Sequence, residues 1–142
     1  MTQVLTSFAT DQTIERLTQM VQQALSETAF ANRMMIAPRR LREIGAVEVR
    51  LFQDFMANPD AETARRHGLD LAASGLGHSS ILRLTAALRA VCWMDAVSEP
   101  TRWYRCAEDY SQALVLGYMQ AREDEIRLEQ ERTRAAYMRT LQ

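Results

Sequence analysis

The stretch PTRWYRCAEDYSQALVLGYMQAREDEIRLEQERTRAAYMRTLQ, residues 100–142, has no Pro after its first residue and no Gly after Gly117. Pro100 suits the first turn of a helix, where its missing N–H group would have no partner. The first half carries apolar residues at helical spacing, namely Trp103, Ala107, Tyr110, Leu114 and Tyr118. From Arg122 onward the helix is charged almost all round. The pattern predicts one long helix that packs on a domain at its start and protrudes into water at its end.

The protruding part, residues 122–142, is predicted to be a stalk that follows a domain of residues 1–121. Opposite charges at helical spacing, Glu123 with Arg127 and Glu129 with Arg132, predict ion pairs worth about 0.2–0.5 kcal/mol each. A two-helix contact between copies is predicted along a seven-residue series and its neighbours: Leu114, Tyr118, Ala121, Leu128 and Ala135, flanked by Ile126 and Met138. Because no Gly, Asn or Pro stops the helix before Gln142, we expect a free stalk or a link to a further domain.

Upstream segments also have helical periodicity. Residues 11–28 carry Ile14, Leu17, Val21 and Leu25 on one stripe, with Thr10 or Asp11 as the cap. Before them, Val4, Leu5 and Phe8 predict another helical turn or an arm on a partner subunit, and residues 29–36 an irregular connection. A second helix begins at Pro38, with Leu41, Ile44, Leu51, Phe52 and Phe55 inside, and ends at Asn58-Pro59-Asp60.

Two further helices are predicted before the long one. Asp60 caps a helix that ends at Gly75, which favours the left-handed conformation common after helix C-termini. Ser79 or Ser80 then caps a helix that continues to about Met94, with Ile81, Leu84, Leu88 and Val91 at helical spacing. The fold class is therefore all-α, a helical bundle with a long protruding C-terminal helix.

Composition narrows the function. The chain has 142 residues, the length of one domain, and its 17 basic residues, all Arg, against 18 acidic ones give a net charge of −1. That balance argues against nucleic acid or an anionic membrane as partner. Cys92 and Cys106 are expected to be reduced core residues, and no signal peptide or long apolar run is visible, so a cytoplasmic location is expected.

No common catalytic, phosphate-binding or metal-binding motif occurs, so we expect a non-enzymatic protein without a metal site. Alternatives remain open. His67 or His78 could serve as an axial ligand to haem. A small ligand could occupy a pocket lined by Leu71, Leu84, Leu88, Cys92, Trp103 and Tyr110. Residues 71–81 also resemble a helix-turn-helix, with Arg83 and Arg89 as the long basic side chains for DNA.

The segment ARRHGLDLAASGLGHSSILRLTAALRAVCWM, residues 64–94, resembles the N-terminal sensory domains of RsbR-type stressosome proteins, which are non-haem globins. EQERTRAAY, residues 129–137, resembles the helical linkers that join such bacterial sensors to STAS, GAF or histidine-kinase modules. In haem-binding sensor globins the ligating His stands four residues before a helix-ending Gly. The resemblance places Leu71 at that position, ahead of Gly75, and Leu cannot ligate iron.

The resemblance implies a globin-like bundle that pairs through its first and last helices and holds no cofactor. Our principal hypothesis is a cytoplasmic, homodimeric signalling input domain that relays a signal through its C-terminal helix to an output module. The alternatives are a haem- or small-ligand-binding globin sensor and a helix-turn-helix DNA-binding regulator.

Overall fold

The computed structural model describes residues 10–94 and 97–142 and has an all-α fold over that part of the chain. The α-helices are α2 (Asp11–Glu27), α3 (Pro38–Ala57), α4 (Ala61–Ala73), α5 (His78–Ala90) and α6 (Pro100–Thr140), with short 3-10 helices η1 (Ala29–Ala31) and η2 (Val91–Trp93). The all-α class and the long C-terminal helix are thus confirmed. The predicted N-terminal turn or arm with Val4, Leu5 and Phe8 lies outside the described residues.

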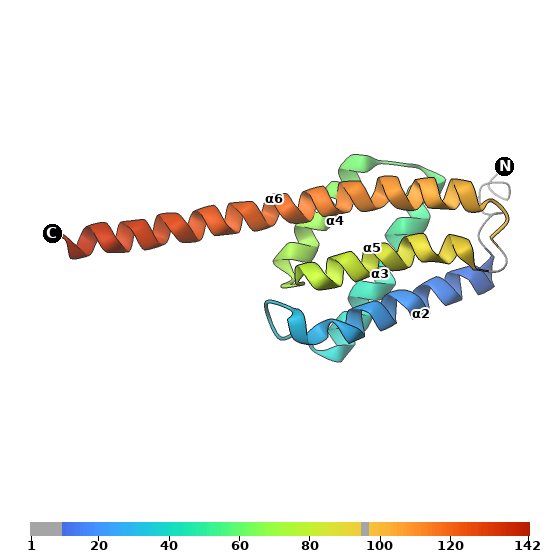
Figure 1. The fold of residues 1–142 in the computed structure, drawn as a ribbon, viewed down its shortest axis with the longest axis horizontal. Coiled ribbons are helices and arrows are strands. Elements are labelled where there is room, and N and C mark those ends of the chain that lie inside the picture. The colour runs from blue at the N-terminus through green and yellow to red at the C-terminus, as the bar shows by residue number, and fades with distance from the viewer. Residues whose placement is uncertain (1–9, 95–96) are drawn as a thin grey trace.

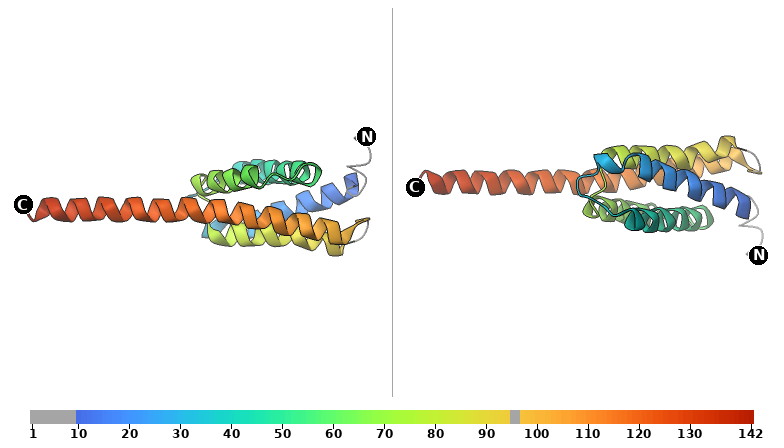
Figure 2. Two further views of the ribbon diagram at one scale, coloured as in Figure 1. Left: turned by 90° about the horizontal axis from the view of Figure 1, so that it is seen from above. Right: turned by 90° about the horizontal axis from the view of Figure 1, so that it is seen from below.

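The helices form two layers. α2, α5 and α6 lie side by side, and α3 and α4 cross behind them (Figure 1). Both views of Figure 2 place α3 and α4 together on one side of α6, and α2 runs obliquely with its N-terminal end toward the α3 and α4 side. The core between the layers is built from the apolar faces of α2 to α6 and includes Leu17, Val21, Leu41, Phe52, Leu71, Leu84, Leu88, Trp103, Tyr110 and Leu114.

Local sequence signals place the helix ends. Thr10 caps α2, because its Oγ1 accepts a 3.1 Å hydrogen bond from Thr13 N. Asp60 caps α4 by accepting hydrogen bonds from the backbone N–H groups of Glu62 and Thr63. Gly75 follows α4 with a backbone φ of 92°, a conformation that residues other than glycine rarely adopt. These three predicted boundaries are confirmed.

The predicted cap of α5 is wrong. The helix begins at His78 with Gly77 as its N-cap, and neither Ser79 nor Ser80 caps it. The Oγ of Ser80 is buried and lies 2.7 Å from Thr28 Oγ1 and 2.9 Å from Asn32 Oδ1. Because these partners belong to the segment after α2, Ser80 joins two parts of the fold instead of capping its own helix.

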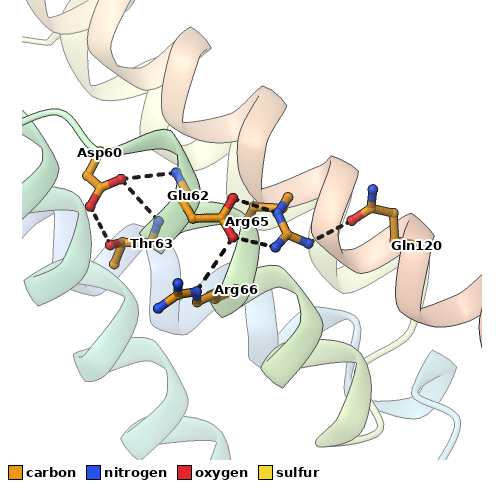
Figure 3. A network of polar contacts seen from close by, with 6 residues as sticks. All are labelled: Asp60, Glu62, Thr63, Arg65, Arg66 and Gln120. Carbon is orange, nitrogen blue, oxygen red and sulfur yellow. Dashed lines mark hydrogen bonds and ion pairs between the residues drawn. The ribbon is translucent and has the colours of Figure 1, made fainter.

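Two glycines allow α4 and α6 to touch backbone to backbone. A Cβ built on Gly68 of α4 would lie 2.0 Å from Leu114 O, and one built on Gly117 of α6 would lie 1.8 Å from Arg65 O. Both distances are far shorter than any van der Waals contact, so the crossing excludes every side chain at these positions. Beside it, Arg65 donates a 2.9 Å hydrogen bond to Gln120 Oε1, and Glu62 binds both Arg65 and Arg66 (Figure 3).

α6 spans 41 residues, about 60 Å at 1.5 Å per residue, and only its first half packs on the other helices. Leu114 and Tyr118 are 0% and 4% exposed, buried in the core of their own chain. The predicted contact series therefore begins on the face of α6 that meets α4, where a second copy has no access. Farther along that series Ala121 is half-buried and Leu128 and Ala135 are exposed.

The ion pairs of the stalk, residues 122–142, also differ from those predicted. In this stretch Arg122 pairs with Glu125 at 2.7 Å and Arg127 with Asp124 at 3.9 Å. The expected Glu123–Arg127 and Glu129–Arg132 pairs do not form among the described residues, and Arg127 pairs with Asp124 instead of Glu123.

Replacing Gly117 with Ala should lower the free energy of unfolding by about 1–3 kcal/mol, because the new methyl group overlaps Arg65 O and forces α4 away from α6. Gly45→Ala on α3 is the matched control. Its Cβ would meet only the flexible end of the Gln22 side chain, so the higher helix propensity of Ala should make the change neutral or stabilising by up to about 1 kcal/mol. Urea unfolding followed by circular dichroism compares the two, and equal effects would contradict the close crossing.

Candidate functional site

A carboxylate is buried in the middle of the helical bundle. Glu48 lies on α3, one helical turn after Ile44 and one before Phe52, so it stands on the apolar row of that helix. Its side chain is 0% exposed. Burying a carboxylate is costly unless its oxygens are hydrogen-bonded, so its partners determine what this position can do.

Both oxygens of Glu48 have partners on other helices. The Tyr110 hydroxyl on α6 donates a 2.6 Å hydrogen bond to Oε1, and His67 Nε2 on α4 contacts Oε2. The rings of Phe52 and Phe55 pack edge-on against Tyr110, with centroids 5.5 and 5.3 Å away. We call Glu48, His67 and Tyr110 the buried triad, and it ties together α3, α4 and α6.

The surroundings of the triad change the pKa values of His67 and Tyr110. Burial alone would lower the pKa of His67, but the hydrogen bond to Glu48 and the negative charge of Glu48, with a smaller effect of Asp70, outweigh it and raise this pKa above its ordinary value. Burial, the nearby Glu48 charge and the hydrogen bond raise the pKa of Tyr110 far above its usual range. Tyr110 is therefore a neutral hydrogen-bond donor, and His67 keeps its proton to a higher pH than a free imidazole does.

A cavity of about 380 Å³ opens beside the triad. Tyr110 and His67 form part of its wall, and α3 and the start of α4 supply most of the remaining lining. The apolar lining residues are Leu51, Phe55, Ala57 and Ala64, and the other polar ones are Asp54, Asn58, Asp60 and Thr63. Glu48 is 0% exposed and does not line the cavity, so a ligand here meets His67 and Tyr110 before it meets that carboxylate.

The predicted ligand-pocket residues lie mostly in the packed core. Leu71, Leu84, Leu88, Cys92, Trp103 and Tyr110 all belong to the main apolar cluster. Trp103 donates its indole N–H to Leu88 O at 2.9 Å. Tyr110 is the member of this set that lines the cavity beside the triad. The residues chosen from sequence spacing are thus core residues, and one of them, Tyr110, also lines the cavity.

The two histidines proposed for haem are placed differently. His67 is largely buried, and the Nε2 atom that would bind iron contacts Glu48. His78 is exposed at the first residue of α5. Iron ligation by His67 through this atom would first require the bond to Glu48 to break.

The basic residues of the possible helix-turn-helix have acidic neighbours. Arg83 forms a 2.6 Å ion pair with Glu27 of α2, and Arg89 lies 4.0 Å from Glu108 of α6. Contact with a DNA phosphate would compete with both carboxylates.

Sequence reasoning missed Glu48, although a signal was present. A charged residue on the row Ile44-Glu48-Phe52 interrupts an otherwise apolar helix face, which indicates a buried and therefore partnered carboxylate. It also missed Asp54 and Thr63, which line the cavity, because residues at the ends of helices have no periodicity that marks a pocket.

Comparisons with protein-family models, curated proteins and solved structures found no match. Within residues 10–94 and 97–142, no group of three or more His, Cys, Asp or Glu side chains is arranged to hold a metal ion. None of the helices in this part of the chain combines the length and the apolar character that a bilayer span needs. The function is therefore inferred from the geometry of the triad, the cavity and α6.

The raised pKa of His67 predicts a pH-dependent stability. A group whose pKa is higher in the folded chain stabilises the fold fully below its unfolded pKa, about 6.5 for His, and loses that contribution as pH rises through the folded pKa. The stability advantage of the native protein over His67→Gln should therefore shrink as pH increases from about 6.5. Urea unfolding of both proteins on either side of neutral pH measures it. A difference that is constant with pH would show that His67 is not charged in the fold.

Proposed function

We propose that this protein is a non-enzymatic signalling input domain that works as a homodimer and relays changes in its helical body along α6 to an output module. The proposed output module is a STAS, GAF or histidine-kinase module. The observation that supports this most is the continuity of α6, a single helix whose first half is buried in the body and whose residues from Ile126 on are all exposed. A displacement of the buried half is transmitted to the exposed half because the helix has no break.

A polar joint connects the body to the start of the stalk. The Arg33 guanidinium forms a 2.6 Å ion pair with Glu125, which also pairs with Arg122. Arg33 further donates a 3.4 Å hydrogen bond from Nη1 to Ala72 O at the end of α4, and its backbone N–H donates to Gly75 O at 2.9 Å. A movement of the α4–α5 turn thus reaches α6 through one side chain.

The proposed dimer contact follows a different stripe of α6 from the one that spacing suggested. Leu116, Met119, Ile126 and Tyr137 are all exposed, and they occupy four positions of the alternating three- and four-residue series 116, 119, 123, 126, 130, 133 and 137. The other three positions hold the polar residues Glu123, Gln130 and Thr133. We call this stripe the exposed seam. The series through Leu128 lies on the opposite side of the helix, which continues the face that packs on α4.

Two stalk substitutions test the dimer. Ile126 and Leu128 are 47% and 49% exposed in the protomer, so either can accept Glu without disturbing the fold. Ile126→Glu should weaken the dimer at least about tenfold, because it replaces an apolar seam residue with a second carboxylate three residues from Glu123, while Leu128→Glu should leave it unchanged. Sedimentation equilibrium at micromolar concentrations measures both. A monomeric native protein, or equal effects of the two substitutions, would contradict the proposal.

The relay is tested at the polar joint. Spin labels on Glu129→Cys, in a chain with Cys106→Ser, should give a short distance between the two subunits of the dimer. Arg33→Gln removes the ion pair to Glu125, an interaction worth about 1 kcal/mol or less, and should broaden or shift that distance distribution. Arg132→Gln, an exposed change within the stalk, is the control and should have no effect. If Arg33→Gln leaves the distribution as it was, the joint does not set the stalk geometry.

A further inference from the structure

The cavity beside the buried triad has an apolar wall and an acidic rim. Leu51, Phe55 and Ala64 give it an apolar lining, and its volume of about 380 Å³ lies within the range of small-molecule pockets. Asp54 and Asp60 both line it, and none of its described lining residues is Arg, although the chain has 17 basic residues, all Arg. The charge of the cavity is therefore negative.

Asp60 is already satisfied by the fold. Its carboxylate accepts hydrogen bonds from Thr63 Oγ1 and from the first backbone N–H groups of α4, and these bonds, with a small effect of Arg66, lower its pKa. The helix N-terminus carries partial positive charge, which balances much of this carboxylate.

Asp54 has no such compensation. It lies on the last turns of α3, is exposed at the cavity, and forms no side-chain hydrogen bond or ion pair with the described residues. On α3, Arg50 lies one helical turn before Asp54 but forms no ion pair with it. On α4, Arg65 and Arg66 are held by Glu62 (Figure 3). The charges of Glu48 and a protonated His67 cancel within the triad. Asp54 is thus the carboxylate that a ligand would neutralise.

We propose that this cavity binds a small organic cation, an ammonium group carried on an apolar body. The ammonium would lie at Asp54, and the apolar part would pack on Leu51, Phe55 and Ala64 beside the ring of Tyr110. An anion would meet two carboxylates and no lining Arg. The further step, that such a cation is the stimulus of the relay, rests on the proposed function, whereas binding itself does not.

Three probes of one shape test the charge preference. Benzylammonium, benzyl alcohol and benzoate are titrated into the full chain and followed by amide chemical shifts, which should move around Thr63, Ala64 and His67. Benzylammonium should bind at least about fivefold more tightly than the alcohol, and benzoate more weakly than both. Asp54→Asn should remove the advantage of the cation, while Asp124→Asn, the same change on the stalk, should retain it.

The outcomes separate the site from the relay. Similar affinities for the three probes, shifts located elsewhere, no binding of benzylammonium at millimolar concentrations, or an unchanged preference in Asp54→Asn would each overturn the cation site. Charge-selective binding that also alters the distance between labels at residue 129 supports both the site and its role as stimulus. Charge-selective binding without that change retains the site and rejects the cation as the stimulus.

Discussion

The close crossing of α4 and α6 at Gly68 and Gly117 fixes the position of α4, and much of the remaining structure depends on it. At this crossing a side chain on either helix would overlap a carbonyl oxygen of the other, so the two backbones lie at their closest possible separation. His67 is the residue before Gly68, and Tyr110 lies two helical turns before Gly117. The crossing therefore brings both side chains to the same place in the bundle. A wider separation of the helices would leave Glu48 with fewer partners than it has oxygens.

The buried triad is a costly way to join three helices. Moving two charges out of water costs several kcal/mol per ion after relaxation, and apolar side chains of similar volume often give equal or greater stability. Glu48 nevertheless accepts bonds from α4 and α6, and the helix that carries it also supplies much of the cavity lining. Directional bonds specify one arrangement of α3, α4 and α6, whereas apolar packing tolerates small slides. A ligand that altered one of these bonds would change the relative positions of three helices together.

Signals confined to one helix were readable from the sequence, and those that depend on distant partners were not. Thr10, Asp60, Gly75 and Pro100 mark helix ends because their effects act on the next few backbone groups. The partners of Glu48 lie 19 and 62 residues away along the chain, and no local pattern specifies them. Periodicity identified an apolar stripe through Leu114 but could not tell whether the chain's own body or a second copy covers it. The resemblance to globin-type sensors extends beyond what the all-α fold alone establishes, and it stays a prediction.

The two ends of α4 explain how a cavity on one side of the bundle could act on a stalk on the other. Its first turns carry Thr63 and Ala64, which line the cavity, and its last turn offers Ala72 O to Arg33, the partner of Glu125. A helix of 13 residues is about 20 Å long and bends little over that length. The backbones of α4 and α6 touch at Gly68, so α4 cannot move closer to α6 at that point. In the proposed relay, a push at the cavity end therefore tilts α4 about the crossing. That tilt moves Ala72 in the direction opposite to the cavity end of α4. The movement changes the ion pair between Arg33 and Glu125 of α6, where the stalk begins.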